Sequence, residues 1–145
     1  MKKQWKQFLF PLRGLGSLYI AAVLCMSASC IQEDRTTVVF GTVKDDVNNP
    51  IAGVNVELYG MKGVFQGRRT FLKTTKTDAK GEYNITAEIS KDFHSGDLDI
   101  IPNEKILEKY SIDVSKLYFN GNQTNDCCRV SVGQKSQYDL VLFRK

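Results

Sequence analysis

The feature that most constrains the fold of this chain is a two-residue alternation of apolar and polar side chains in several short segments. Residues 39–44, 54–59, 83–89 and 138–142 place apolar side chains at every second position, with mostly polar ones between them. Successive side chains of a β-strand point to opposite faces, so this period is typical of strands with one buried side. Residues 71–77, rich in threonine, predict a further strand. The chain is therefore expected to be all-β.

Turn-forming residues separate these segments. Residues 45–50 are rich in Asp and Asn and end in Pro, and residues 78–81 run from Asp to Gly. Short strands between such turns predict an antiparallel β-sandwich. The alternation is lost after residue 101, where a proline and a potential capping asparagine predict a short helix near residues 103–110. Residues 120–126 are expected to be loop and residues 127–132 a strand.

The first 30 residues have the order of features found in an export signal. Three lysines lie within the first six residues, a mostly apolar stretch covers residues 15–26, and three small residues precede Cys30. A cleaved signal peptide over residues 1–29 explains this order. A transmembrane anchor is the alternative, but glycines and serines interrupt the stretch, whereas a spanning helix needs about 20 mainly apolar residues.

Residues 27–30, Ser-Ala-Ser-Cys, resemble the lipobox of bacterial lipoproteins, whose cysteine thiol receives a diacylglyceryl group and becomes the mature N-terminus. Ordinary cleavage after Ser29 would cut the same bond and is the alternative. Residues 30–35 would then be a lipidated tether and residues 36–145 the folded domain. The acidic residues after Cys30 also resemble the export signals of some surface lipoproteins. We therefore expect an outer-membrane lipoprotein of a Gram-negative bacterium, periplasmic or surface-facing, attached through Cys30.

The distribution of charge argues against a nucleic-acid partner. The formal net charge of +4 comes from 20 Lys and Arg against 16 Asp and Glu. Four basic residues and no acidic residue lie before residue 30, so the remaining chain is balanced. A balanced domain has no excess positive charge to match a phosphate backbone. The expected partners are the membrane, through the lipid, and an unidentified envelope protein or glycan.

Three segments together carry a resemblance to a known family. Residues 41–45 (Gly-Thr-Val-Lys-Asp), residues 49–56 (Asn-Pro-Ile-Ala-Gly-Val-Asn-Val) and residues 75–85 (Thr-Lys-Thr-Asp-Ala-Lys-Gly-Glu-Tyr-Asn-Ile) are similar to the signature of carboxypeptidase regulatory-like domains. Residues 132–140 are similar to that family's closing turn and strand, whereas residues 90–131 depart from its pattern. The resemblance implies a transthyretin-like (prealbumin-like) sandwich of about seven strands and a non-catalytic accessory domain.

Residue types that catalyse reactions are scarce. His94 is the only histidine, whereas zinc peptidases and deaminases need two or more correctly spaced His or Cys ligands. The chain has no Gly-x-Ser-x-Gly segment of the kind that carries a hydrolase nucleophile. Asp92, Asp97 and Asp99 gather around His94, but their spacing matches no known calcium loop, so a solvated loop is the preferred interpretation. We expect no enzymatic activity, no catalytic residue, no metal and no cofactor.

Two adjacent cysteines, Cys127 and Cys128, stand out in the predicted strand 127–132. Alternation places Cys128 toward the core with Val130 and leaves Cys127 facing outward. Adjacent α-carbons lie about 3.8 Å apart across a trans peptide, below the usual span of a disulfide. The preferred interpretation is a buried Cys128 with a free or partner-linked thiol at Cys127. A vicinal disulfide that serves as a redox switch is the alternative.

An exposed aromatic pair is the remaining candidate for a binding surface. Carbohydrate-binding surfaces favour Trp and Tyr, and the only tryptophan, Trp5, leaves with the signal. Tyr118 and Phe119 are therefore the better candidate for a contact patch. The sequence predicts a non-enzymatic cell-envelope lipoprotein that acts as a binding or assembly module. The alternative is an extracellular glycan-binding lipoprotein.

Overall fold

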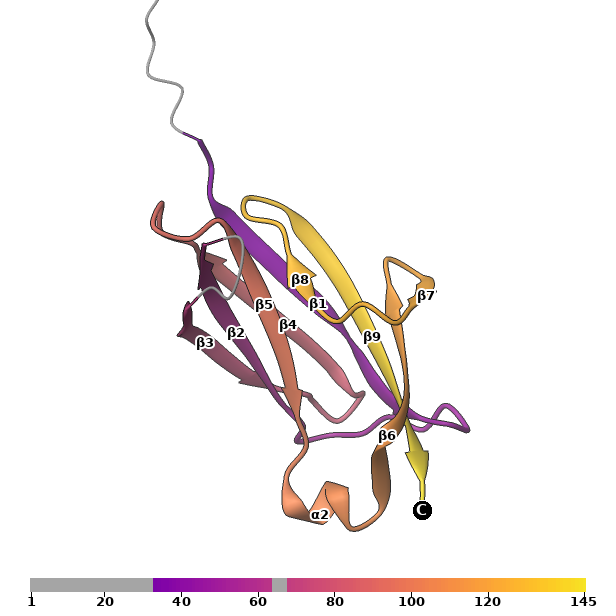
Figure 1. Ribbon diagram of the computed structural model, residues 1–145. Coiled ribbons are helices and arrows are strands. Elements are labelled where there is room, and N and C mark those ends of the chain that lie inside the picture. The colour runs from indigo at the N-terminus through magenta and orange to yellow at the C-terminus, as the bar shows by residue number, and fades with distance from the viewer. Residues whose placement is uncertain (1–32, 64–67) are drawn as a thin grey trace, which may run out of the picture. The chain divides into compact units, whose positions relative to one another are not determined.

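The computed structural model describes residues 33–63 and 68–145, and residues 33–145 belong to one compact unit (Figure 1). In chain order the elements are β1 (Thr36–Asp45), β2 (Asn55–Lys62), β3 (Arg68–Lys76), β4 (Glu82–Glu88), β5 (Ser95–Ile101), α2 (Glu104–Leu107), β6 (Tyr110–Phe119), β7 (Asn122–Thr124), β8 (Arg129–Val130) and β9 (Lys135–Arg144). The all-β prediction is confirmed.

Two sheets face each other and enclose the core (Figure 1). The larger sheet has the order β4-β1-β9-β6-β7, and the smaller has the order β3-β2-β5-β8. Buried side chains alternate along β1, β2, β4 and β9, as the two-residue period predicts. The core contains Val39, Val43, Ile51, Val54, Val56, Leu58, Tyr83, Ile85, Leu98, Ile106, Leu117, Cys128, Val130, Tyr138, Leu140 and Leu142. The sandwich is confirmed, with nine strands among the described residues where about seven were expected.

One strand pair departs from the expected antiparallel arrangement. β1 and β9 run parallel in the middle of the larger sheet, from Val38 opposite Lys135 to Asp45 opposite Leu142. The expectation of a wholly antiparallel sandwich is therefore wrong at this pair. A two-residue period reports which face of a strand is buried, but it carries no information about which strand lies beside it or in which direction.

The parallel pair is locally opened at Gly41 and Thr42. A side chain on Gly41 would overlap the backbone carbonyl of Tyr138. The buried hydroxyl of Tyr83, on β4, donates a 2.8 Å hydrogen bond to that same carbonyl. The backbone N–H of Thr42 donates to Asp139 Oδ1 at 2.8 Å. At this junction, side chains thus replace backbone groups as hydrogen-bond partners. Only glycine fits at position 41, because any side chain would overlap the Tyr138 carbonyl.

Between β5 and β9 the chain forms the short helix α2 and the β6–β7 hairpin. Helix α2 is confirmed, and the Asn103 side chain caps it by accepting a hydrogen bond from the backbone N–H of Ile106. The prediction that residues 120–126 form only a loop is wrong, because β7 lies within them and pairs with β6. Asn120 and Gly121 both have positive φ, 48° and 82°. An Asn-Gly pair favours this tight hairpin turn.

We expect Gly41→Ala to destabilise the domain more than a glycine replacement at an open position. Overlap with the Tyr138 carbonyl should cost roughly 3 kcal/mol in the free energy of unfolding, because backbone on both strands must move. Gly53→Ala is the matched control, since Gly53 has open space and a φ of 79°. Its backbone strain alone should cost about 1 kcal/mol. Urea unfolding measures both, and equal losses would contradict the close approach at Gly41.

Candidate functional site

The structure places the two aromatic residues of the predicted contact patch, Tyr118 and Phe119, on opposite faces of β6. Phe119 lies opposite Tyr138 on β9, and their ring centroids are 4.9 Å apart, although Phe119 itself remains 37% exposed. Tyr118 lies opposite Asp139 and faces outward. Adjacent residues of a strand point to opposite faces, so the two aromatic rings cannot contact one ligand together. The lipid-attachment candidate, Cys30, lies outside the described residues.

The outer face of the larger sheet carries two adjoining hollows. The first, about 510 Å³, is lined by Phe40, Gly41, Thr42, Asp78, Glu82, Tyr83, Asn84 and Gln137. The second, about 260 Å³, is lined by Thr42, Lys44, Asn48, Tyr118, Gly121, Asp139, Leu140 and Val141. Thr42 belongs to both, so they meet over the junction between β1 and β9. We refer to these two hollows together as the outer-face groove.

A hydrogen-bonded carboxylate forms the floor of the outer-face groove. Asp139 Oδ1 accepts hydrogen bonds from the backbone N–H and the hydroxyl of Thr42, both at 2.8 Å. Asp139 Oδ2 accepts one from the side-chain amide of Gln137 at 2.6 Å. Three donors therefore occupy the carboxylate. The hydrogen bonds from Thr42 join β1 to β9.

The side chains around this floor can contact a bound ligand. Phe40 and Tyr118 contribute aromatic rings, whereas Asn84 and Glu82 add polar groups on the β4 side. An aromatic ring can pack against the apolar face of a sugar or a peptide side chain, and amides can hydrogen-bond its polar edge. The outer-face groove could therefore hold an extended polar ligand. Most of these residues were not named as candidates from the sequence. Several of them occupy outward-facing positions of the alternating strands, and that pattern could have pointed to them.

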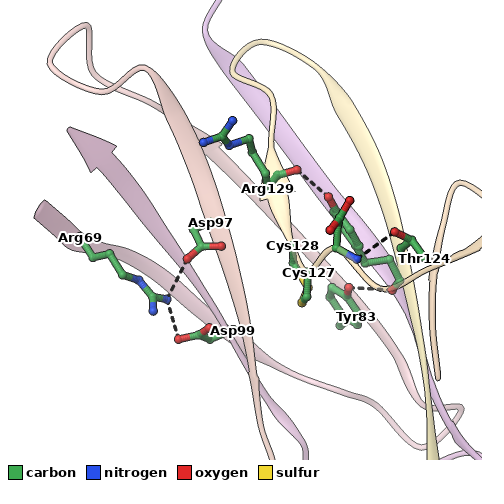
Figure 2. The surroundings of a disulfide bond; sticks show 10 residues. Arg69, Tyr83, Asp97, Asp99, Thr124, Cys127, Cys128 and Arg129 are labelled. Atoms are coloured by element: carbon green, nitrogen blue, oxygen red, sulfur yellow. Dashed lines mark hydrogen bonds and ion pairs between the residues drawn. A yellow bond between two sulfur atoms is a disulfide. The ribbon is translucent and has the colours of Figure 1, made fainter. Parts of the chain in front are cut away.

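The acidic segment around His94 is only partly the solvated loop that was expected. Asp97 and Asp99 lie on β5 beside Arg69 of β3, whose Nη2 is 3.3 Å from Asp97 Oδ2 and 2.6 Å from Asp99 Oδ2 (Figure 2). The guanidinium carbon also lies 4.3 Å from the centroid of the Tyr59 ring. Burial raises the pKa of the Asp97 carboxyl, while the charge of Arg69 opposes that rise. One arginine thus serves both carboxylates.

Across residues 33–63 and 68–145, no three His, Cys, Asp or Glu side chains gather closely enough to hold a metal ion. No helix in this described part of the chain is long and apolar enough to cross a bilayer.

Cys127 and Cys128 form a disulfide, and the peptide bond between them is cis (Figure 2). The preferred expectation of a free or partner-linked thiol at Cys127 is therefore wrong, and the alternative, a vicinal disulfide, is what the structure contains. The expected burial is confirmed, because Cys128 is 1% exposed within the core and Cys127 is exposed. The predicted strand 127–132 is reduced to β8, which begins after the disulfide.

Comparisons with known proteins give no family. No family model matches the sequence, and no curated protein matches it significantly. A Streptococcal ancillary pilin is similar in structure, with 16% identity and a TM-score of 0.44 over 78% of this chain and 34% of the pilin. A 9R-lipoxygenase from Cyanothece PCC8801 has 15% identity and a TM-score of 0.42 over 90% of this chain and 20% of the lipoxygenase. The chain thus spans a minor part of each.

We expect neither Cys127 nor Cys128 to react with a bulky thiol reagent in the native, unreduced protein. The tryptic peptide 117–129 should be about 2 Da lighter than its reduced form, as a disulfide requires. After mild reduction Cys127 should react first, because its side chain is exposed whereas that of Cys128 is buried. Peptide mass mapping separates both from the other cysteines. Reaction of Cys127 without reductant would contradict the disulfide.

Proposed function

We propose that this protein is a non-enzymatic binding or assembly module of the bacterial cell envelope, held at the outer membrane by a lipid on Cys30. The observation that carries the proposal is the outer-face groove, an open surface of aromatic and amide side chains built on a rigid sheet. Such a surface offers contacts to a partner. The resemblance to carboxypeptidase regulatory-like domains, which are accessory domains, agrees with the same role.

The start of the folded unit agrees with attachment through Cys30. Compact structure begins at Glu33, only three residues after this cysteine. A span of three residues covers at most about 11 Å. A lipid on Cys30 would therefore hold the domain close to the membrane surface, with little freedom to move away from it.

Glycan binding is the second candidate function, and a specific feature favours it. Phe40 and Tyr118 line the two adjoining hollows, with Thr42 shared between them. Sugar-binding proteins use aromatic rings to pack against pyranose faces and amide groups to bind hydroxyls. An extracellular glycan-binding lipoprotein would present this same surface to its ligand.

We expect the protein extracted from membranes to lack residues 1–29 and to carry added acyl mass on Cys30, because lipidation of this thiol defines a lipoprotein's mature N-terminus. Intact-mass spectrometry of the detergent-extracted protein measures both changes. Cys30→Ala should lose the acyl mass and leave the membrane fraction. A Cys30→Ala protein that still fractionates with membranes would contradict attachment at this residue.

The two candidate functions differ in what contacts the outer-face groove. A photo-crosslinking residue in place of Tyr118 should capture one outer-membrane protein in living cells, whereas the same residue in place of Phe119 should not capture that protein. The reason is that Phe119 points away from the outer-face groove, to the face of β6 that contacts Tyr138. Calorimetry against a glycan panel tests the second candidate. Micromolar glycan binding that is lost in Tyr118→Ala and kept in Phe119→Ala would favour the glycan-binding function instead.

A further inference from the structure

We propose that the end of the sandwich where the chain enters is a basic docking surface for the phosphate groups of membrane lipids. This inference rests on the proposed lipid attachment at Cys30. It concerns a different surface from the outer-face groove, and it assigns that surface a ligand: the anionic headgroups of the membrane that holds the anchor.

A hollow of about 450 Å³ lies at this end, beside the first described residues. Its lining comes from the entering chain, the loop between β4 and β5, and the segment from β8 to β9, all of which lie at one end of the sandwich in Figure 1. Basic side chains dominate its charge, since Arg35, Lys91 and Arg129 line it with Glu33 as the single acidic residue. Ser95, Ser131 and backbone add neutral polar groups.

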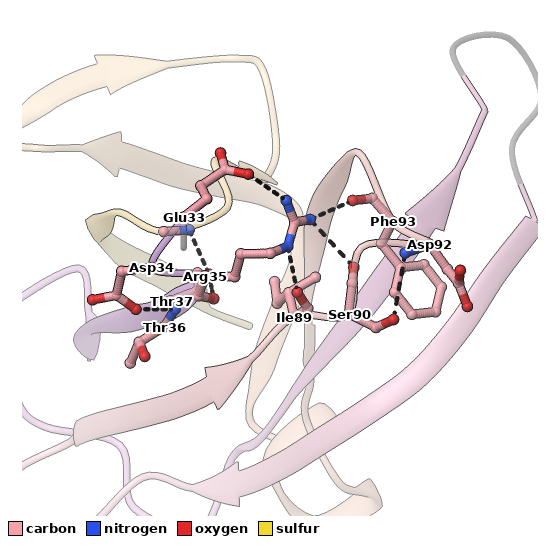
Figure 3. A network of polar contacts seen from close by, with 10 residues as sticks. Glu33, Asp34, Arg35, Thr36, Thr37, Ile89, Ser90, Asp92 and Phe93 are labelled. Carbon is pink, nitrogen blue, oxygen red and sulfur yellow. Dashed lines mark hydrogen bonds and ion pairs between the residues drawn. The ribbon is translucent and has the colours of Figure 1, made fainter. Parts of the chain in front are cut away.

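A network around Arg35 holds this surface in shape (Figure 3). Its guanidinium donates to the carbonyls of Ile89 at 2.7 Å, Ser90 at 3.2 Å and Phe93 at 2.7 Å. The Arg35 carbonyl accepts in return from the backbone N–H of Ile89 at 3.2 Å. The Arg35 side chain is only 14% exposed. The loop that carries Lys91 is therefore fixed against the entering chain, three to five residues after the proposed lipid.

Three of the acidic side chains at this end have a partner among the described residues. Glu33 lies 3.3 Å from Arg35, and Asp92 lies 3.7 Å from Lys62. Asp34 accepts a hydrogen bond from the backbone N–H of Thr36 at 2.8 Å.

Two exposed basic side chains at this end remain available to a ligand. Lys91 and Arg129 form no ion pair within the described residues. Asp97 lies opposite Arg129 across the strand pair, but its carboxylate contacts Arg69, at 3.3 Å, and forms no ion pair with Arg129. The surplus positive charge at the hollow thus rests on Lys91 and Arg129.

The short chain between Cys30 and Glu33 favours a lipid headgroup as the ligand of this hollow. Cys30 precedes Glu33, which lines the hollow, by three residues, and three residues span at most about 11 Å between α-carbons. That distance is comparable to the Debye length of about 8 Å at physiological salt, so anionic headgroups would attract these basic groups. A basic surface beside acyl chains supplies a second membrane-binding signal. A different ligand would have to compete with lipid phosphates held at this short distance.

The opposite end of the sandwich provides a matched control. Helix α2 lies there, and Lys105 on α2 is exposed like Lys91 (Figure 1). Glu104 and Glu108 stand beside Lys105 and Lys109 in this segment, so its acidic and basic residues balance. Contact with a membrane at the tether end should protect Lys91 and leave Lys105 accessible.

The test uses the acylated mature protein, residues 30–145, reconstituted into vesicles of phosphatidylcholine with or without phosphatidylglycerol. A water-soluble amine-acylating reagent is added, and the modification rates of Lys91 and Lys105 are read by peptide mass spectrometry. We expect Lys91 to react several-fold more slowly in the anionic vesicles, with Lys105 unchanged. High salt should abolish the difference, because it screens the attraction. Arg129→Glu should restore the fast rate at Lys91, whereas Lys105→Glu should not.

Equal rates at Lys91 in the two vesicle types would overturn the inference, as would equal protection of Lys105. Protection of Lys91 in intact cells but not in anionic vesicles would also overturn it and would indicate a protein at this surface. An intact mass without acyl groups would overturn the lipid attachment and this inference together. An acylated protein with equal rates would overturn the headgroup contact alone, so the two failures are distinguishable.

Discussion

The pairing of the first strand with the last is the constraint on which the rest of this structure depends. β1 and β9 lie side by side in the centre of the larger sheet, so the sheet is complete only when both ends of the domain have met. Gly41 permits the close approach, and Tyr83 bonds the carbonyl that the approach leaves without a backbone partner. Contacts between residues almost a hundred positions apart thus decide whether the core is enclosed at all.

The same junction also forms the outer-face groove. Where the backbone ladder opens, Asp139 and Thr42 bond each other and create the floor shared by the two hollows. Aromatic and amide side chains then border a surface that cannot shift without separating β1 from β9. A binding surface held by the centre of a sheet keeps its shape between the free and bound states, which lowers the entropic cost of association.

Local patterns in the sequence predicted local structure well. Alternation identified the buried faces of β1, β2, β4 and β9, and a capping asparagine identified α2. The alternation could not predict which strands pair or in which direction, because a period of two is the same for parallel and antiparallel partners. Tyr118 and Phe119 were grouped in one patch because no strand was predicted there, whereas β6 directs them to opposite faces. Burial of Cys128 followed from alternation, whereas its bond to Cys127 did not.

Native-state hydrogen exchange tests the central role of the β1–β9 pair most directly. If this pair completes the domain, amides at Val39 and Val43 of β1 and at Leu140 and Leu142 of β9 should exchange only through global unfolding. Their opening free energies should then agree with one another and with the free energy of unfolding from urea. Opening of β9 at a clearly lower free energy than β1 would show that the last strand is dispensable, and it would contradict the account.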